Sequence, residues 1–128
     1  MIEVNINQAI AGVKAIVAVH GYDYVYTKKR VIEGAAPRCV YVYNGQPDCL
    51  VGKFLASQGV SIRDLERGDT AAFGSAAEDV LHDLGKRGIL GTDGETFQFL
   101  ANLQYEQDRG TTWGEALSRA TNVILLGD

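Results

Sequence analysis

The chain has 128 residues, a formal net charge of −4 and a pI of about 5.1, and 46% of its residues are hydrophobic. This length suits one compact domain, and we expect residues 1–128 to form it. The acidic balance argues against a nucleic-acid partner, because phosphate contacts need a basic surface. Apolar runs such as Ala15–Val19 are too short to cross a bilayer, and the N-terminus has no basic signal region, so we expect a cytoplasmic protein without a membrane partner.

The first predicted element is a helix over residues 5–19. Apolar side chains recur there at helical spacing, at Ile6, Ile10, Val13 and Val17. Asn5 or Asn7 is a suitable N-terminal cap, and Gly21 is a suitable end. We therefore expect an amphipathic helix that packs one face on the core.

Two tyrosine-rich segments, residues 22–27 and 38–43, alternate in the way expected of strands. We expect them to pair as an antiparallel hairpin, which would bring their aromatic side chains together. The residues expected to share a strand face are Tyr22, Tyr24 and Tyr26 on the first strand, and Cys39, Tyr41 and Tyr43 on the second.

A second helix is expected to start at Pro47 and Asp48, because proline suits the first helical position and a carboxylate suits the N-terminal dipole. Gly59 is the expected end of this helix. Residues 61–66 are then expected to form a short helical turn.

Three Ser/Thr-x-x-Glu patterns predict the starts of three further helices, at Ser75, Thr92 and Thr112. Gly88 and Gly110 are expected to end the first two, so the last two helices form a helix-turn-helix-like pair. The predicted fold is α+β, with a small antiparallel hairpin or sheet packed against about five helices. The helix after Thr92 is expected to expose a polar face made of Gln98, Asn102, Gln104, Glu106, Gln107, Asp108 and Arg109.

Few residues suggest catalysis. Cys49 at a helix N-terminus could have a lowered thiol pKa, but a buried, inert thiol is the favoured interpretation. His20 and Asp23 could transfer protons beside Tyr24 if they lined a pocket, although a surface pair is the simpler interpretation. No Gly-x-Ser-x-Gly nucleophile motif occurs. We expect no catalytic residues.

Metal and phosphate motifs are equally weak. The glycines between residues 85 and 94 lack the order of a phosphate-binding loop. Glu78 and His82 stand four residues apart and could share a metal, but the His-Glu-x-x-His order is missing. We therefore expect no cofactor and no metal.

The candidate binding residues are the tyrosines of the expected hairpin together with the one basic run. An exposed tyrosine-rich sheet could stack bases or form a protein interface, and burial under the helices is the competing interpretation. The candidates are Tyr22, Tyr24, Tyr26, Lys28, Lys29, Arg30, Tyr41 and Tyr43.

Two sequence patterns carry a resemblance to a known group of proteins. One is Pro-x-Cys-Leu-Val-Gly over residues 47–52, and the other is Gln-x-x-Gln-Asp-x-Gly-x-x-Trp-Gly-x-Ala over residues 104–116. The chain resembles small proteins of unknown function encoded by actinobacteria and their bacteriophages. The resemblance covers about half of the chain and brings no catalytic residues. It implies an accessory phage or prophage protein in a bacterial cytoplasm.

Our leading hypothesis from the sequence is therefore a non-enzymatic accessory protein that binds a host protein, with self-association into a homodimer left open. The first alternative is a small-ligand or nucleotide-binding protein whose pocket is built from residues 28–30 and the tyrosines. The second is a nucleic-acid-binding regulator.

Overall fold

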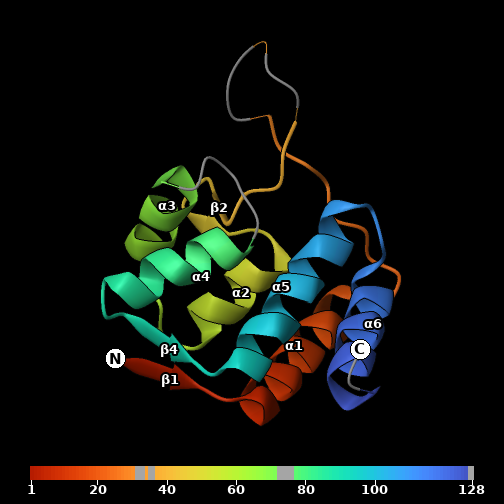
Figure 1. Ribbon diagram of the computed structural model, residues 1–128. Coiled ribbons are helices and arrows are strands. Elements are labelled where there is room, and N and C mark those ends of the chain that lie inside the picture. Colours follow the sequence, from red (N-terminus) through yellow and green to blue (C-terminus); the bar gives the residue numbers. More distant parts are fainter. Residues whose placement is uncertain (31–33, 35–36, 72–76, 127–128) are drawn as a thin grey trace.

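The computed structural model describes residues 1–30, 34, 37–71 and 77–126. Within these ranges the chain forms six helices and four short strands, which confirms the predicted α+β class (Figure 1). The helices are α1 (Ile6–His20), α2 (Leu50–Ser57), α3 (Ile62–Ala71), α4 (Ala77–Lys86), α5 (Gly94–Asp108) and α6 (Trp113–Leu126). The strands are β1 (Ile2–Val4), β2 (Val42–Tyr43), β3 (Gln46–Pro47) and β4 (Leu90–Thr92).

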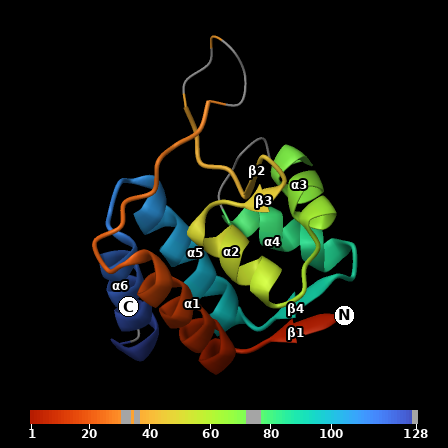
Figure 2. The same cartoon turned by 180° about the vertical axis from the view of Figure 1, so that it is seen from behind.

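Strands β1 and β4 were not predicted from the sequence. They pair in parallel, with Ile2 opposite Leu90 and Val4 opposite Thr92. Both strands run in the same direction and lead into helices, β1 into α1 and β4 into α5 (Figures 1 and 2). This short parallel pair therefore ties the starts of two core helices to each other.

Helix α1 begins and ends as predicted. The Asn5 side chain accepts a hydrogen bond from the Gln8 backbone N–H, and the Gln8 side chain accepts one from the Asn5 backbone N–H, both at 2.9 Å. This reciprocal capping box satisfies two N–H groups that would otherwise lack helical partners. Gly21 ends the helix with a φ of +102°, a conformation that favours glycine.

The predicted caps of the last helices are partly wrong. Asp93 caps α5 in place of Thr92 and accepts a hydrogen bond from the Thr96 backbone N–H at 2.8 Å. Thr92 is not the cap because it belongs to β4. Thr112 does cap α6, since its hydroxyl accepts from the Glu115 backbone N–H at 3.2 Å. The predicted cap at Ser75 lies outside the described residues.

The first predicted tyrosine strand is wrong, because residues 22–27 form no strand. The carbonyls of Tyr22 and Tyr24 instead accept hydrogen bonds from the backbone N–H groups of Gly114 and Trp113, at 2.9 and 2.8 Å. The first N–H groups of a helix have no intrahelical acceptors, so α6 recruits these distant carbonyls. The segment is thus used as a helix cap.

The second tyrosine strand is shorter than predicted. Within residues 38–43 only β2 is a strand, and it pairs with β3 around the Asn44-Gly45 turn. Among the described residues, an isolated antiparallel bridge between Lys29 and Arg38 joins the chain that follows the first tyrosine-rich segment to the start of the second.

The starts of α2 and α3 also differ from prediction. Pro47 lies in β3, and Cys49 is the N-terminal cap of α2, with its sulfur accepting from the Gly52 backbone N–H at 3.3 Å. Helix α3 spans ten residues, longer than the predicted turn, and the Ser61 hydroxyl caps it by accepting from the Asp64 backbone N–H. This helix brings the count to six.

Helix α5 lies in the middle of the fold and packs against α1, α2, α4 and α6 (Figure 1). Because neighbours cover it on several sides, Gln104 and Gln107 are buried, which corrects the predicted polar face. Helices α5 and α6 pack along each other, while their helix-turn-helix arrangement stays a prediction. None of the described helices combines the length and apolar character needed to cross a membrane.

Candidate functional site

Gln107 joins three helices inside the protein. Its Oε1 accepts one hydrogen bond from the Leu50 backbone N–H at 2.9 Å and one from the Trp113 ring N–H at 3.2 Å. Leu50 and Trp113 are fully buried. A buried donor without a partner is costly, so this side chain has a clear structural role.

Asp108 extends this buried polar cluster. Its Oδ1 accepts from the side-chain amides of Gln104 at 2.9 Å and Gln107 at 3.2 Å. It also shares a hydrogen bond with the Cys39 thiol. Burial raises the pKa of Asp108, and these hydrogen bonds oppose the rise. We call Gln104, Gln107, Asp108 and Trp113 the polar core cluster.

Both cysteines are free and buried, in agreement with the favoured interpretation of Cys49 as a buried, inert thiol. Burial raises the pKa of Cys39 to about 12, and Asp108 adds to the rise. The pKa of Cys49 lies well above its ordinary value for the same main reason, although the Gly52 N–H opposes the rise. At neutral pH both thiols are protonated and poorly nucleophilic.

The two resemblance patterns, residues 47–52 and 104–116, contact each other at this cluster, where the Leu50 backbone N–H donates to Gln107. A Cβ added to Gly114 would lie 2.1 Å from the Tyr22 ring, and one added to Gly52 would lie 2.6 Å from the Tyr41 carbonyl oxygen. Gly110 has a φ of +88°, which the turn before α6 requires. The patterns therefore contain residues that the fold needs for close packing and tight turns.

The predicted tyrosines do not share one face. Tyr22 is 54% exposed, whereas Tyr41 is only 1% exposed. Tyr24 packs edge-on against Trp113, with ring centroids 4.5 Å apart. Tyr26 is buried and donates a hydrogen bond from its hydroxyl to Asp48. Whether any of these tyrosines binds a partner stays a prediction.

The basic run is also divided. Lys28 is exposed. Lys29 is half-buried, and its Nζ lies 3.2 Å from the Asp48 carboxylate and 4.8 Å from the Tyr26 ring centroid. Arg30 is exposed and lines a cleft that also includes Tyr43. The structure thus brings two of the predicted residues together at one concave site.

We call this concavity the basic cleft. It has a volume of about 350 Å³ and lies where the Lys29–Arg38 bridge meets the β2–β3 turn and helix α3. Its polar lining residues are Arg30, Arg38, Tyr43, Asn44, Glu66 and Asp69.

The back of the basic cleft holds a buried carboxylate that sequence analysis missed. Asp69 is 6% exposed, and its Oδ2 accepts from the Tyr41 backbone N–H at 3.1 Å. Its Oδ1 lies 3.7 Å from Nη1 of Arg38, and neither of these two buried atoms makes a hydrogen bond within the described structure. Burial raises the pKa of Asp69, while the Tyr41 N–H and Arg38 oppose the rise. The signal in the sequence was its position four residues after buried Leu65 in α3.

A second cavity of about 500 Å³ lies over α4 and α5. Phe97, Tyr105 and Ala77 supply apolar walls, while Glu78 and Asp108 supply carboxylates. Because Asp108 already accepts hydrogen bonds from two glutamines and a thiol, its capacity to bind a ligand is largely used.

Both histidines pack against aromatic rings. His82 packs against the Phe97 ring, and His20 packs against Tyr24 and Trp113. Across the described part of the chain, no three His, Cys, Asp or Glu side chains gather closely enough to hold a metal ion. Comparisons with protein-family models, curated proteins and solved structures found no match.

Proposed function

We propose that this chain is a non-enzymatic interaction protein that binds another protein through the basic cleft. The observation that supports this is the local charge. Lys28, Lys29, Arg30 and Arg38 supply four of the chain's 12 basic residues within eleven positions, and two of them, Arg30 and Arg38, line the cleft together with the carboxylates of Glu66 and Asp69. Arginine and tyrosine, which line this cleft, are also enriched where proteins bind each other.

The chemistry of the interior supports a binding role over a catalytic one. Cys39 and Cys49, the two thiols, are protonated and buried. The polar core cluster directs its hydrogen bonds to backbone and side-chain groups that hold α2, α5 and α6 together. These residues stabilise the fold and leave recognition to the surface.

The expected partner presents an acidic side chain to the exposed edge of Arg38, because complementary charge at a contact speeds association and selects partners, while Glu66 and Asp69 balance the formal charge of the lining as a whole. The resemblance to actinobacterial and phage proteins makes a bacterial host protein in the cytoplasm the expected partner. A second copy of this acidic chain is the other outcome to test for.

Affinity purification followed by reconstitution tests the proposal. A protein captured by the wild-type chain is purified and must bind it again in isolation. Binding should be lost when Arg30 and Arg38 are both changed to Gln. It should persist when Arg63 and Lys86, two exposed basic residues outside the cleft, are changed to Gln, because this control removes the same charge. The proposal is rejected if the captured partner binds the Arg30 and Arg38 variant as well as the wild type, or if no captured protein binds again in isolation.

A small-ligand-binding protein is the second candidate. The volume of about 350 Å³ lies within the usual range of ligand pockets, and Arg30 and Tyr43 are among the lining residues. Native mass spectrometry of the purified protein distinguishes the two. A retained adduct that disappears when Arg30 and Arg38 are changed to Gln would favour the small ligand.

A further inference from the structure

We propose that Arg38 is the residue of the basic cleft that binds a carboxylate of an acidic polypeptide, and that Asp69 positions it from behind. This inference rests on the proposed function, because it names the group that the cleft recognises. It assigns a binding role to one residue and a positioning role to the other.

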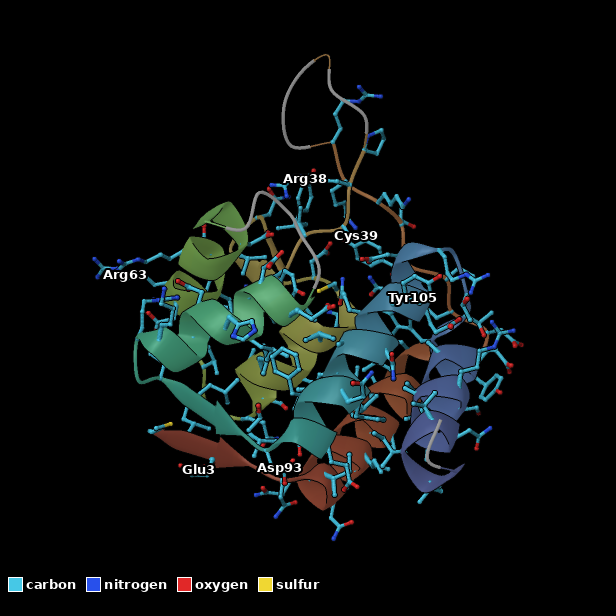
Figure 3. All side chains as sticks on the ribbon, in the orientation of Figure 1. Glu3, Arg38, Cys39, Arg63, Asp93 and Tyr105 are labelled. Carbon is cyan, nitrogen blue, oxygen red and sulfur yellow. The ribbon has the colours of Figure 1, made fainter. Side chains whose placement is uncertain are left out.

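The backbone of Arg38 is fixed before any partner arrives. Its N–H donates to the Lys29 carbonyl and its carbonyl accepts from the Lys29 N–H, both at 2.8 Å. Figure 3 shows Arg38 above Cys39 in this view. A side chain that starts from a fixed backbone loses less conformational freedom when it binds.

The guanidinium of Arg38 faces two environments. Nη1 is buried 3.7 Å from Oδ1 of Asp69, whereas 32% of the side chain remains exposed in the cleft. Arginine carries five N–H donors in a planar fork, so a contact on one edge leaves the other edge able to bind. Asp69 itself is held by the Tyr41 backbone N–H. The buried carboxylate can therefore orient the guanidinium without consuming its hydrogen bonds.

A carboxylate fits the exposed edge best, because arginine and carboxylate form paired, charge-assisted hydrogen bonds. Arg30 and Asn44, the latter in the β2–β3 turn, also line the cleft. Asn44 has a φ of +53°, which fixes the shape of this turn. Glu66 also lines the cleft and would repel an anion, which gives the inference a distinctive test.

The test is a titration of the full-length protein, followed by NMR of its backbone amides at low ionic strength. The probe is a tetraglutamate peptide with both ends blocked. We expect saturable shifts centred on residues 40–44 and Asp69. The Arg38→Gln variant should bind at least about tenfold more weakly, and Arg38→Lys should also be weaker because lysine lacks the planar fork.

Three further variants separate a defined site from general charge. Arg63 projects from α3 away from the body, so Arg63→Gln should keep the affinity within about twofold (Figure 3). Glu66→Gln should tighten binding because it removes a repulsive charge. Asp69→Asn should weaken binding by about threefold or more if Asp69 orients Arg38. Amide spectra of each variant confirm that it is folded.

The inference is wrong if Arg38→Gln and Arg63→Gln weaken binding equally, if Glu66→Gln weakens it, or if inorganic phosphate binds more tightly than the peptide. The two proposals can also fail separately. If a purified partner binds in a way that depends on Arg30 and Arg38, but the peptide does not bind, only the carboxylate inference is rejected. Peptide binding that needs Arg38, without any protein partner, rejects only the interaction function.

Discussion

Replacement of Gln107 by Met should destabilise the fold strongly, although the two side chains have similar volumes. Gln107 accepts hydrogen bonds from the Leu50 backbone N–H and the Trp113 ring N–H, and both donors lie on fully buried residues. Methionine offers only a weak sulfur acceptor in this place. The change therefore isolates hydrogen bonding from cavity formation.

The expected cost follows from the number of donors left without a partner. Each buried, unsatisfied donor costs about 1–3 kcal/mol, so two donors cost roughly 2–6 kcal/mol. Asp108 also loses the hydrogen bond that it accepts from the Gln107 amide at 3.2 Å. A domain of this kind is stable by about 5–15 kcal/mol, so the variant should lose a large share of its free energy of unfolding.

Urea unfolding measures this cost directly. Trp113 is the chain's one tryptophan, and it sits at the altered contact, so its fluorescence reports the same region while circular dichroism reports the helices. Gln98→Met is the matched control, because Gln98 is exposed on the same helix and its replacement should change stability by no more than about 0.5 kcal/mol.

A Gln107→Met variant that unfolds at the wild-type urea concentration, with an unchanged slope, would refute the reasoning. It would mean that the Leu50 and Trp113 donors find other acceptors at little cost. Coincident fluorescence and circular dichroism transitions are needed for either conclusion, because they establish two-state unfolding.

Three further results are expected. Gly114→Ala should cost about 1–3 kcal/mol in urea unfolding, because its Cβ would lie 2.1 Å from the Tyr22 ring, and added Tyr22→Ala should recover most of this loss. Cys39 should resist a thiol reagent at about pH 8 until the protein unfolds, since a pKa of about 12 leaves roughly one thiol in 10⁴ ionised. The pKa of Asp93 is lowered by its hydrogen bonds from Thr96, so its stabilisation is present above the ordinary value of 3.8 and is lost as pH falls through the lowered value. Asp93→Asn should reduce this acid-side loss of stability, measured as urea midpoints at decreasing pH.

The parts of the fold that could be predicted are those fixed by local contacts. Asn5 caps α1 through Gln8, only three residues away, and Gly21 ends it through its own backbone conformation. The buried face of α4 follows from apolar spacing alone. In each case the deciding partner lies within one or two helical turns.

The prediction errors arise where a segment distant in the sequence determines the local structure. Strand β1 has three residues and pairs with β4 nearly ninety residues later, so neither shows a periodic pattern of its own. Residues 22–27 alternate like a strand, yet α6 uses their carbonyls as a cap. Local propensity is a weak guide wherever such long-range partners are present.

The candidate site was predicted only in part, because some of its residues are brought together by distant segments of the chain. Arg30 and Tyr43 were chosen for their chemistry, and the structure places both at the basic cleft. Arg38 and Asp69 were missed because they lie 31 residues apart, on a bridge and on a helix that the sequence does not connect. A carboxylate on the buried side of an amphipathic helix was the available signal.

The two resemblance patterns contribute no side chain to the proposed binding site, but they contact the backbone that supports it. No residue of either pattern lines the described part of the basic cleft. The patterns and the cleft meet instead at the backbone of Tyr41. Its carbonyl lies against Gly52 of the first pattern, and its N–H is held by Asp69 at the back of the cleft. Any side chain at position 52 would push the Tyr41 carbonyl and, through the same peptide segment, the carboxylate that faces Arg38. Residues that appear purely structural therefore set the geometry of the proposed recognition site.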